Sequence, residues 1–173
     1  MDGAGTDKTA LLREAQKGDE KAFEQLVNIC YNSLYRTVFQ MVPNRADVEE
    51  ILQETFYRFY LSLKRVRETD PTPYLRQIAV RRTYTFLGKK RTEVSFDDIP
   101  ENVPELVIEG RPFELRDLYE FASGLAPKRR MIFMLREILG YEDAEISREL
   151  GISEVTVRRH AQLAKDELRK KIP

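Results

Sequence analysis

Apolar residues recur at spacings of three and four along most of this sequence, and that spacing limits the chain to helical folds. The longest run covers about five turns before Pro43 and Asn44 interrupt it, and it comprises Phe23, Leu26, Val27, Cys30, Leu34, Val38 and Met41. The same spacing predicts helices over about 46–64 and 74–89. Because no alternating pattern of the kind that marks strands is present, we predict an all-α fold.

The segment over residues 92–112 interrupts the helical pattern. It contains three prolines and six acidic residues, so we interpret it as a flexible acidic linker. The linker divides the chain into two small helical domains, over 8–91 and 113–173. Its apolar residues are too many for an inert tether, and we expect part of it to dock on a neighbouring domain.

Charge is sorted along the chain although the formal net charge is zero, with 29 basic and 29 acidic residues. Residues 74–91 hold six bases and no acid, and residues 158–171 hold six bases against two acids. Both basic segments fall on predicted helices, which favours a nucleic-acid partner.

The sequence also indicates where the protein works. No apolar run reaches the roughly 20 residues of a membrane span, and the first residues lack the apolar core of a signal peptide, so we expect a cytoplasmic protein without membrane insertion. Cys30 is the single cysteine, and its place on an apolar helix face predicts a buried small hydrophobe.

A helix, a turn and a second helix are predicted near the C-terminus, in EISRELGISEVTVRRHAQLA. Gly151 is placed to end the first helix in a left-handed conformation, Ile152 to fill the turn, and Ser153 to cap the next helix. We expect four residues of that helix to face inward: Val157, Ala161, Ala164 and Leu168. The prediction is a helix-turn-helix.

The outer face of the second helix would then carry five polar side chains: Arg158, Arg159, Gln162, Lys165 and Arg169. A helix in a DNA major groove presents such a set, because guanidiniums bind guanine edges and phosphates and an amide binds adenine. A solvated face on an ordinary helical hairpin is the other interpretation.

Both halves together resemble the extracytoplasmic-function (ECF) sigma factors of bacterial RNA polymerase, in the sigma-70 family. The motifs that carry the resemblance are GDEKAFEQLV, ADVEEILQETFYRFYLSL and YLRQIAVRR in the first domain and LAPKRRMIFMLREILGYEDAEISRELGISEVTVRRHAQLAKDEL in the second. The resemblance implies a region 2 bundle of three to four helices that binds polymerase and melts the minus-ten element. It implies a region 4 helix-turn-helix domain for the minus-thirty-five element.

In the first domain the resemblance implies two surfaces. An acidic stripe that grips the polymerase clamp would consist of Asp47, Glu49, Glu50, Gln53, Glu54 and Phe56. The minus-ten surface would consist of Arg65, Arg67, Tyr74, Arg76, Arg81, Arg82 and Lys89. Two positions depart from the family, since Arg81 occupies the place of a base-reading Asn and Thr85 that of a frequent Asp.

In the second domain the resemblance implies that the minus-thirty-five element is bound by Arg136, Arg158, Arg159, Gln162 and Lys165. Leu163 departs from the family, where Arg is frequent. His160, the single histidine, has no second His or Cys nearby in the sequence, which favours packing or a backbone contact over metal ligation.

We expect no catalytic residue, no metal site and no cofactor, because the sequence has no phosphate-cradling glycine loop, no metal-ligand cluster and no nucleophile elbow. The partners implied are core RNA polymerase (through the beta-prime clamp and the beta flap), promoter DNA and an anti-sigma factor, with a monomer when free. A helix-turn-helix regulator without a sigma role is the alternative, but it would not need the acidic helix. We also expect the acidic linker to lie against Arg81, Arg82 or the recognition helix and to shield them from non-specific DNA.

Overall fold

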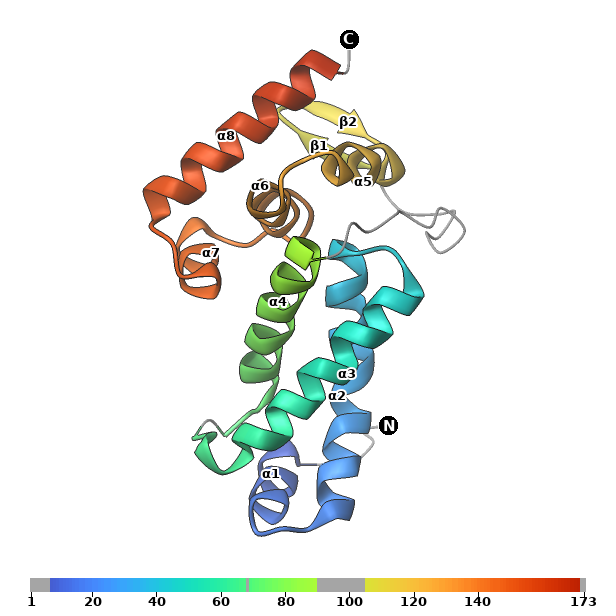
Figure 1. Ribbon diagram of the computed structural model, residues 1–173, viewed down its shortest axis with the longest axis vertical. Helices are drawn as coiled ribbons and strands as arrows, with labels where there is room; N and C mark the ends of the chain where they lie inside the picture. The colour runs from blue at the N-terminus through green and yellow to red at the C-terminus, as the bar shows by residue number, and fades with distance from the viewer. Residues whose placement is uncertain (1–6, 68, 90–104, 172–173) are drawn as a thin grey trace.

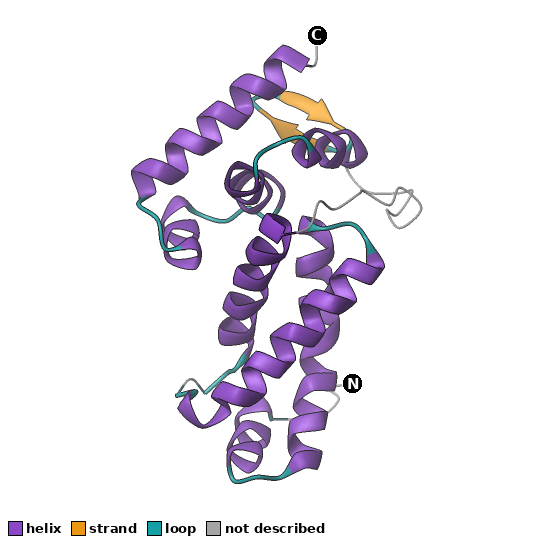
Figure 2. Ribbon diagram, viewed as in Figure 1, coloured by secondary structure: helices purple, strands orange, loops and turns teal. Residues whose placement is uncertain are grey.

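The computed structural model describes residues 7–67, 69–89 and 105–171 (Figure 1). Of the predicted linker, residues 105–112 are therefore described and residues 92–104 lie outside the described residues. The first domain comprises α1 (Lys8–Gln16), α2 (Glu20–Met41), α3 (Arg45–Ser62), a 3₁₀ turn η1 (Leu63–Arg65) and α4 (Thr72–Lys89). The second comprises β1 (Leu106–Ile108), β2 (Arg111–Phe113), α5 (Leu115–Ser123), α6 (Pro127–Phe133), a π-helical turn η3 (Met134–Ile138), α7 (Asp143–Leu150) and α8 (Glu154–Lys171). Helices dominate both domains, as predicted (Figure 2).

Two helices of the first domain begin at residues whose side-chain oxygens accept hydrogen bonds from the first backbone N–H groups. Asp19 Oδ1 accepts hydrogen bonds from the backbone N–H groups of Lys21 and Ala22, at 3.0 and 3.1 Å, and so caps α2. Asn44 Oδ1 caps α3 through the N–H of Asp47 at 3.2 Å. The predicted break at 43–44 is confirmed, because α2 ends at Met41 and α3 begins at Arg45.

The core of the first domain is built from the apolar faces of α2, α3 and α4. Leu26, Leu34, Phe59 and Leu75 are at most 1% exposed. Cys30 is 1% exposed, which confirms the prediction of a buried small hydrophobe, and burial raises the pKa of its thiol. Such a thiol is a poor nucleophile at neutral pH.

A β-hairpin occupies the end of the segment that the sequence analysis assigned to the linker. The expectation of a chain without strands was wrong here, because β1 and β2 pair antiparallel with Ile108 opposite Arg111. Glu109 and Gly110 form the two-residue turn and both have positive φ, 53° and 77°. Ile108 and Phe113 are buried, so the hairpin docks on the second domain through alternate residues of two strands too short to show a period.

The two domains contact each other. Helix α4 contacts α6 and α7, and α2 contacts η3. Figure 1 shows the end of α4 lying against α6, with α7 beside it. Buried apolar residues from both domains belong to one continuous cluster. In this conformation the helix predicted to bind the minus-ten element therefore adjoins the helix-turn-helix.

Candidate nucleic-acid and polymerase interfaces

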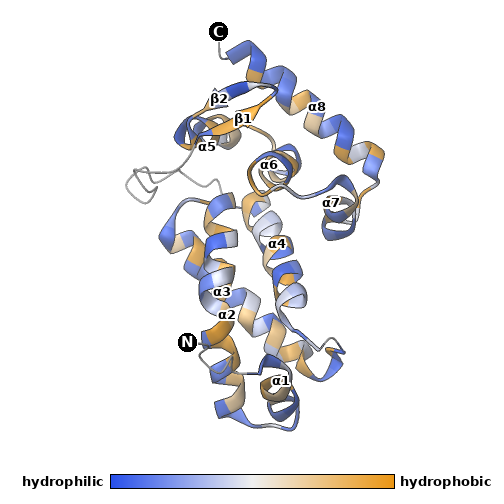
Figure 3. Cartoon of the chain, turned by 180° about the vertical axis from the view of Figure 1, so that it is seen from behind, coloured by the Kyte–Doolittle hydropathy of each residue, from blue (hydrophilic) through white to orange (hydrophobic). Residues whose placement is uncertain are grey.

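The helix-turn-helix has the local geometry that its sequence predicts. Gly151 ends α7 with φ 67°, and the Ser153 hydroxyl accepts a hydrogen bond from the N–H of Thr156 at 3.1 Å. The four residues of α8 predicted to face inward are at most 3% exposed: Val157, Ala161, Ala164 and Leu168. The opposite face of α8 therefore points to solvent, and Figure 3 shows hydrophilic residues along most of that helix.

Three of the predicted minus-thirty-five residues share that exposed face of α8: Arg158, Arg159 and Gln162. Arg158 forms ion pairs with Glu154 at 3.5 Å and with Asp143 at 3.9 Å. The Gln162 amide donates to Asp166 at 3.1 Å. These partners hold the side chains at the surface, and solvent-exposed pairs of this kind are weak enough to be exchanged for DNA.

The other two predicted minus-thirty-five residues lie in more enclosed places. The Arg136 side chain, 30% exposed, pairs with Asp143 at 3.3 Å. The Lys165 side chain is 19% exposed and pairs with Glu137 at 3.3 Å. The expectation that Lys165 shares the solvent-facing side of α8 was therefore wrong, because its ammonium turns back along the helix toward η3.

A group of basic residues beside α8 was not predicted as part of the site. Lys128 and Arg129, in the first turn of α6, lie close enough to His160 to act with burial in lowering its pKa, as does Arg159. Arg129 itself pairs with Glu167. The sequence signal was the run PKRR, but only the fold brings that run to the side of α8.

The minus-ten residues lie on or beside α4. Arg65 lies in η1, Arg67 in the loop that follows, and Arg76, Arg81 and Lys89 are exposed on α4. The Tyr74 hydroxyl donates to Ser62 at 3.0 Å and its ring packs at 6.2 Å from that of Phe59. The hydroxyl and the ring of Tyr74 thus both contact other residues of the bundle.

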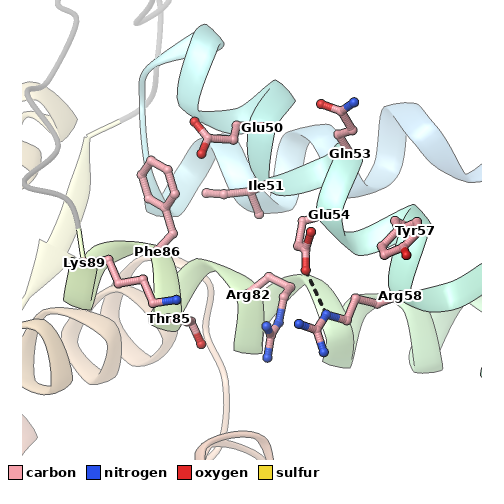
Figure 4. Close-up of a pocket in the computed structure, with 10 residues that line it drawn as sticks. All are labelled: Glu50, Ile51, Gln53, Glu54, Tyr57, Arg58, Arg82, Thr85, Phe86 and Lys89. Carbon is pink, nitrogen blue, oxygen red and sulfur yellow. Dashed lines mark hydrogen bonds and ion pairs between the residues drawn. The ribbon is translucent and has the colours of Figure 1, made fainter. Parts of the chain in front are cut away.

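A groove of about 600 Å³ separates the exposed sides of α3 and α4. Figure 4 shows Glu50, Gln53 and Glu54 on one wall and Arg82 and Lys89 on the other. The residues predicted for polymerase thus adjoin those predicted for DNA. Opposite charges face each other across the groove, which keeps it polar.

The structure excludes Asp47 from the exposed acidic stripe that the sequence predicted. It was expected on the exposed side of the second helix, but it is 5% exposed and lies in the first turn of α3, beside its Asn44 cap. The helix begins there, so its third residue turns against the bundle. Glu49, Glu50 and Gln53 are exposed, while Glu54 and Phe56 are partly buried.

The described part of the chain offers neither a metal-binding cluster nor a membrane-spanning helix. No group of three or more His, Cys, Asp or Glu side chains in it is arranged to hold a metal ion. None of its helices combines the length and the apolar character that a membrane crossing needs.

Comparison with known families identifies both halves. The model of sigma-70 region 2 matches residues 26–93, from α2 through α4, and the model of sigma-70 region 4 matches residues 115–168, from α5 into α8. The order and spacing agree with the two domains. The chain belongs to the sigma-70 family.

Curated relatives of this sigma factor match along most of its length. The RNA polymerase sigma-E factor of Streptomyces coelicolor is 26% identical over 157 residues, which are 90% of this chain and 88% of that protein. The ECF RNA polymerase sigma factor SigE of Mycolicibacterium smegmatis is 24% identical and covers 88% of this chain and 63% of its own. These names place the chain in the ECF group and give no support to a regulator without a sigma role.

Two solved structures share the fold of this chain. CnrH in complex with the cytosolic domain of CnrY has a TM-score of 0.61 at 20% identity, over 96% of this chain and 97% of the other. RpoE of Bartonella quintana with the anti-sigma factor NepR has a TM-score of 0.57 at 15% identity, over 87% and 96%. Sigma factors act by binding and catalyse no reaction, so the expectation of a non-enzymatic chain is confirmed by its family.

Proposed function

We propose that this ECF sigma factor binds core RNA polymerase and directs promoter-specific initiation through the surfaces described above. The observation that carries the proposal is the combination of region 2 and region 4 in one chain of 173 residues. Its place of action is the cytoplasm. The beta-prime clamp and the beta flap of the polymerase are the proposed contact points of regions 2 and 4.

In region 4, α8 enters the major groove of the minus-thirty-five element. Arg158 and Arg159 read guanine edges or phosphates, and Gln162 reads adenine, because these are the side chains that the exposed face of α8 presents. Arg136 and Lys165 act mainly by holding the domain together through Asp143 and Glu137, and they contribute to DNA binding at its edge. Lys128 and Arg129 add phosphate contacts beside His160.

In region 2, α4 and the loop before it capture a base extruded from the minus-ten element. The basic side chains of this surface contact phosphates, and capture of the unstacked base makes melting favourable without ATP. Tyr74 supports this surface through its bond to Ser62 and its contact with the ring of Phe59. Arginine at position 81 lacks the paired donor and acceptor of an amide, so the base preference differs from that of family members with Asn.

The polymerase surface is the exposed side of α3, with Asp47 removed from the set. Glu49, Glu50 and Gln53 present acidic and amide groups to solvent, and Glu54 is held by Arg58 at 2.8 Å. A basic helix of the polymerase clamp is complementary to this surface.

An anti-sigma factor is the proposed regulator. The sigma factor RpoE of Bartonella quintana, which shares this fold, is bound to the anti-sigma factor NepR, and CnrH is bound to the cytosolic domain of CnrY. A chain with the same fold offers a comparable binding surface. In the absence of polymerase and of this inhibitor we propose that the chain is a monomer.

Transcription reconstituted from purified core polymerase and this chain tests the proposal. Core alone should initiate non-specifically, and addition of the chain should give discrete start sites on a genomic DNA library, read by sequencing of the transcripts. Discrete starts that are unchanged when the chain is omitted would refute a sigma role. Binding of the chain to DNA without any effect on core would favour a stand-alone regulator.

A further inference from the structure

Asp143 stands between an arginine of the scaffold and an arginine of the recognition helix. It is the first residue of α7. Its Oδ1 lies 3.3 Å from Nε of Arg136 in η3, and its Oδ2 lies 3.9 Å from Nη1 of Arg158 in α8. One carboxylate therefore links the turn η3 to both helices of the helix-turn-helix.

The position of this carboxylate is fixed by its surroundings. The Asp143 side chain is 20% exposed and that of Arg136 is 30% exposed. Oδ1 of Asp143 is buried, so solvent ions screen its attraction to Arg136 less than they screen a surface pair. The backbone at the start of α7 is held as well, because the N–H of Glu142 donates to Glu145 at 2.8 Å. Asp143 is thus a rigid partner for Arg158.

Arg158 has a second carboxylate partner of a different kind. Glu154 lies one turn earlier on α8 and is 3.5 Å from the same Nη1, but its side chain is 50% exposed. The exposed fractions indicate which of the two pairs DNA displaces. The pair with Glu154 is solvated and weak, whereas Asp143 is enclosed and held from the other side by Arg136.

The pairing at Nη1 leaves Arg158 with a reading edge. Its side chain is 53% exposed, and the edge formed by Nε and Nη2 carries donors suited to the N7 and O6 acceptors of guanine. A long side chain loses rotamer freedom when it binds, and that loss weakens association. A carboxylate that already fixes Nη1 reduces the loss and selects one orientation of the guanidinium.

We propose that Asp143 is a positioning residue that determines specificity, because it holds Arg158 in the orientation that reads guanine in the minus-thirty-five element. Asp143 itself contacts no base. The inference rests on the proposed role of α8 as the recognition helix. Without this carboxylate, Arg158 turns to phosphate contacts, which carry no sequence information, and Arg136 loses its partner and becomes a further phosphate ligand.

The test compares Asp143→Asn with Glu154→Gln in the free, full-length chain. Each replaces a carboxylate beside Nη1 of Arg158 by an amide of nearly the same shape, so Glu154→Gln is the matched control for the loss of negative charge near DNA. The probes are a duplex that the parent selects from a randomised upstream element and a scrambled duplex of the same composition. Fluorescence anisotropy measures the affinity for each duplex.

The two substitutions should have opposite effects on the selected duplex. Asp143→Asn should bind it about fivefold more weakly and bind the scrambled duplex up to about twofold more tightly, so that selectivity falls. Glu154→Gln should bind both duplexes about twofold more tightly. Asp143→Ser keeps a side-chain oxygen at the start of α7 and should behave as Asp143→Asn does. Circular dichroism on each variant verifies that the helices are retained.

A double-mutant cycle with Arg158→Ala separates positioning from a purely structural role. If Asp143 acts through Arg158, Asp143→Asn should leave the ratio of the two affinities unchanged in the Arg158→Ala background. A residue that only stabilises α7 would keep its full effect there, and that result would overturn the inference. Tighter binding of both duplexes by Asp143→Asn, as expected for Glu154→Gln, would show a general charge effect and would overturn it as well.

These measurements use no polymerase, so they are independent of the sigma role. A chain that loses selectivity through Asp143→Asn but fails to direct transcription would contradict only the sigma role. An active sigma factor whose selectivity is unchanged by Asp143→Asn would contradict only the positioning role. A parent that selects no duplex would contradict recognition by α8, and the role of Asp143 with it.

Discussion

Replacement of Arg158 by alanine should weaken binding to the minus-thirty-five element and relax its sequence preference. In the free protein this side chain is 53% exposed and pairs with Glu154 at 3.5 Å and Asp143 at 3.9 Å. The helical pair with Glu154 is worth roughly 0.3–0.5 kcal/mol, so release of the guanidinium costs little. A bidentate contact with guanine contributes about 1 to 3 kcal/mol, and its loss should lower affinity by roughly 5- to 150-fold.

The structure also predicts the opposite effect for the internal partner of Arg158. Glu154→Gln removes a competing carboxylate at the start of α8 and should tighten binding by about twofold, equivalent to roughly 0.3–0.5 kcal/mol. The assay selects duplexes with a randomised upstream element on the reconstituted holoenzyme and then measures affinity for the selected sequence by anisotropy.

The control variant is Arg13→Ala, which removes the same charge from an exposed position on α1, far from α8 in the fold. It should leave both affinity and selected sequence unchanged. If Arg158→Ala weakens binding to every duplex equally, the residue contacts phosphate only. If the selected sequence and the affinity match those of the parent, the assignment of α8 as the recognition helix is wrong.

Two further predictions concern region 2. Glu50→Lys combined with Glu54→Lys should weaken binding to core polymerase at least tenfold, measured by competition with the parent, while the helical content is retained, because exposed charges contribute more to association than to stability. Asp70→Ala removes the carboxylate that accepts from the N–H of Thr72 at 2.9 Å and should lower the free energy of unfolding by about 0.5–2 kcal/mol in urea. Hydrogen bonds from Thr72 lower the pKa of Asp70, so this contribution is complete above the ordinary carboxyl range and is lost as pH falls through the lowered pKa. The variant should therefore lose less stability on acidification than the parent, and equal losses would contradict the capping role.

The parts of the fold that could be predicted from the sequence are those fixed by neighbouring residues. The turn between α7 and α8 follows from Gly151 and Ser153, because a left-handed residue and a cap act over three or four positions. The hairpin could not be predicted, since two strands of three residues are too short for a period. Asp47 was misplaced because the helix register alone does not show which side of the first turn packs against the bundle.

Contacts between residues far apart in the sequence could not be predicted from the sequence pattern. Lys165 turns away from solvent because it pairs with Glu137. The position of the Arg81 side chain depends on its hydrogen bond to the carbonyl of Glu149, which is 68 residues away in the sequence. The shielding by linker acids, predicted from Asp97, Asp98, Glu101, Glu105 and Glu109, lies mostly outside the described residues. Glu109 does bind the recognition helix, but at Arg169 near its C-terminal end, at 2.6 Å, away from Arg158 and Arg159.

The zero net charge of a DNA-binding chain has an explanation in these contacts. Several cations of the proposed DNA surfaces have an internal acceptor in the free protein: Arg158 with Glu154, Arg136 with Asp143, Lys165 with Glu137, and Arg81 with the carbonyl of Glu149. On the proposed function, a cation that leaves its internal acceptor for a phosphate or a base edge gives up that pair, so weak non-specific contacts with DNA gain little. A complete promoter would compensate for these exchanges together. The internal pairing thus lowers affinity for random DNA more than affinity for a promoter presented by the polymerase, and in that way contributes to specificity.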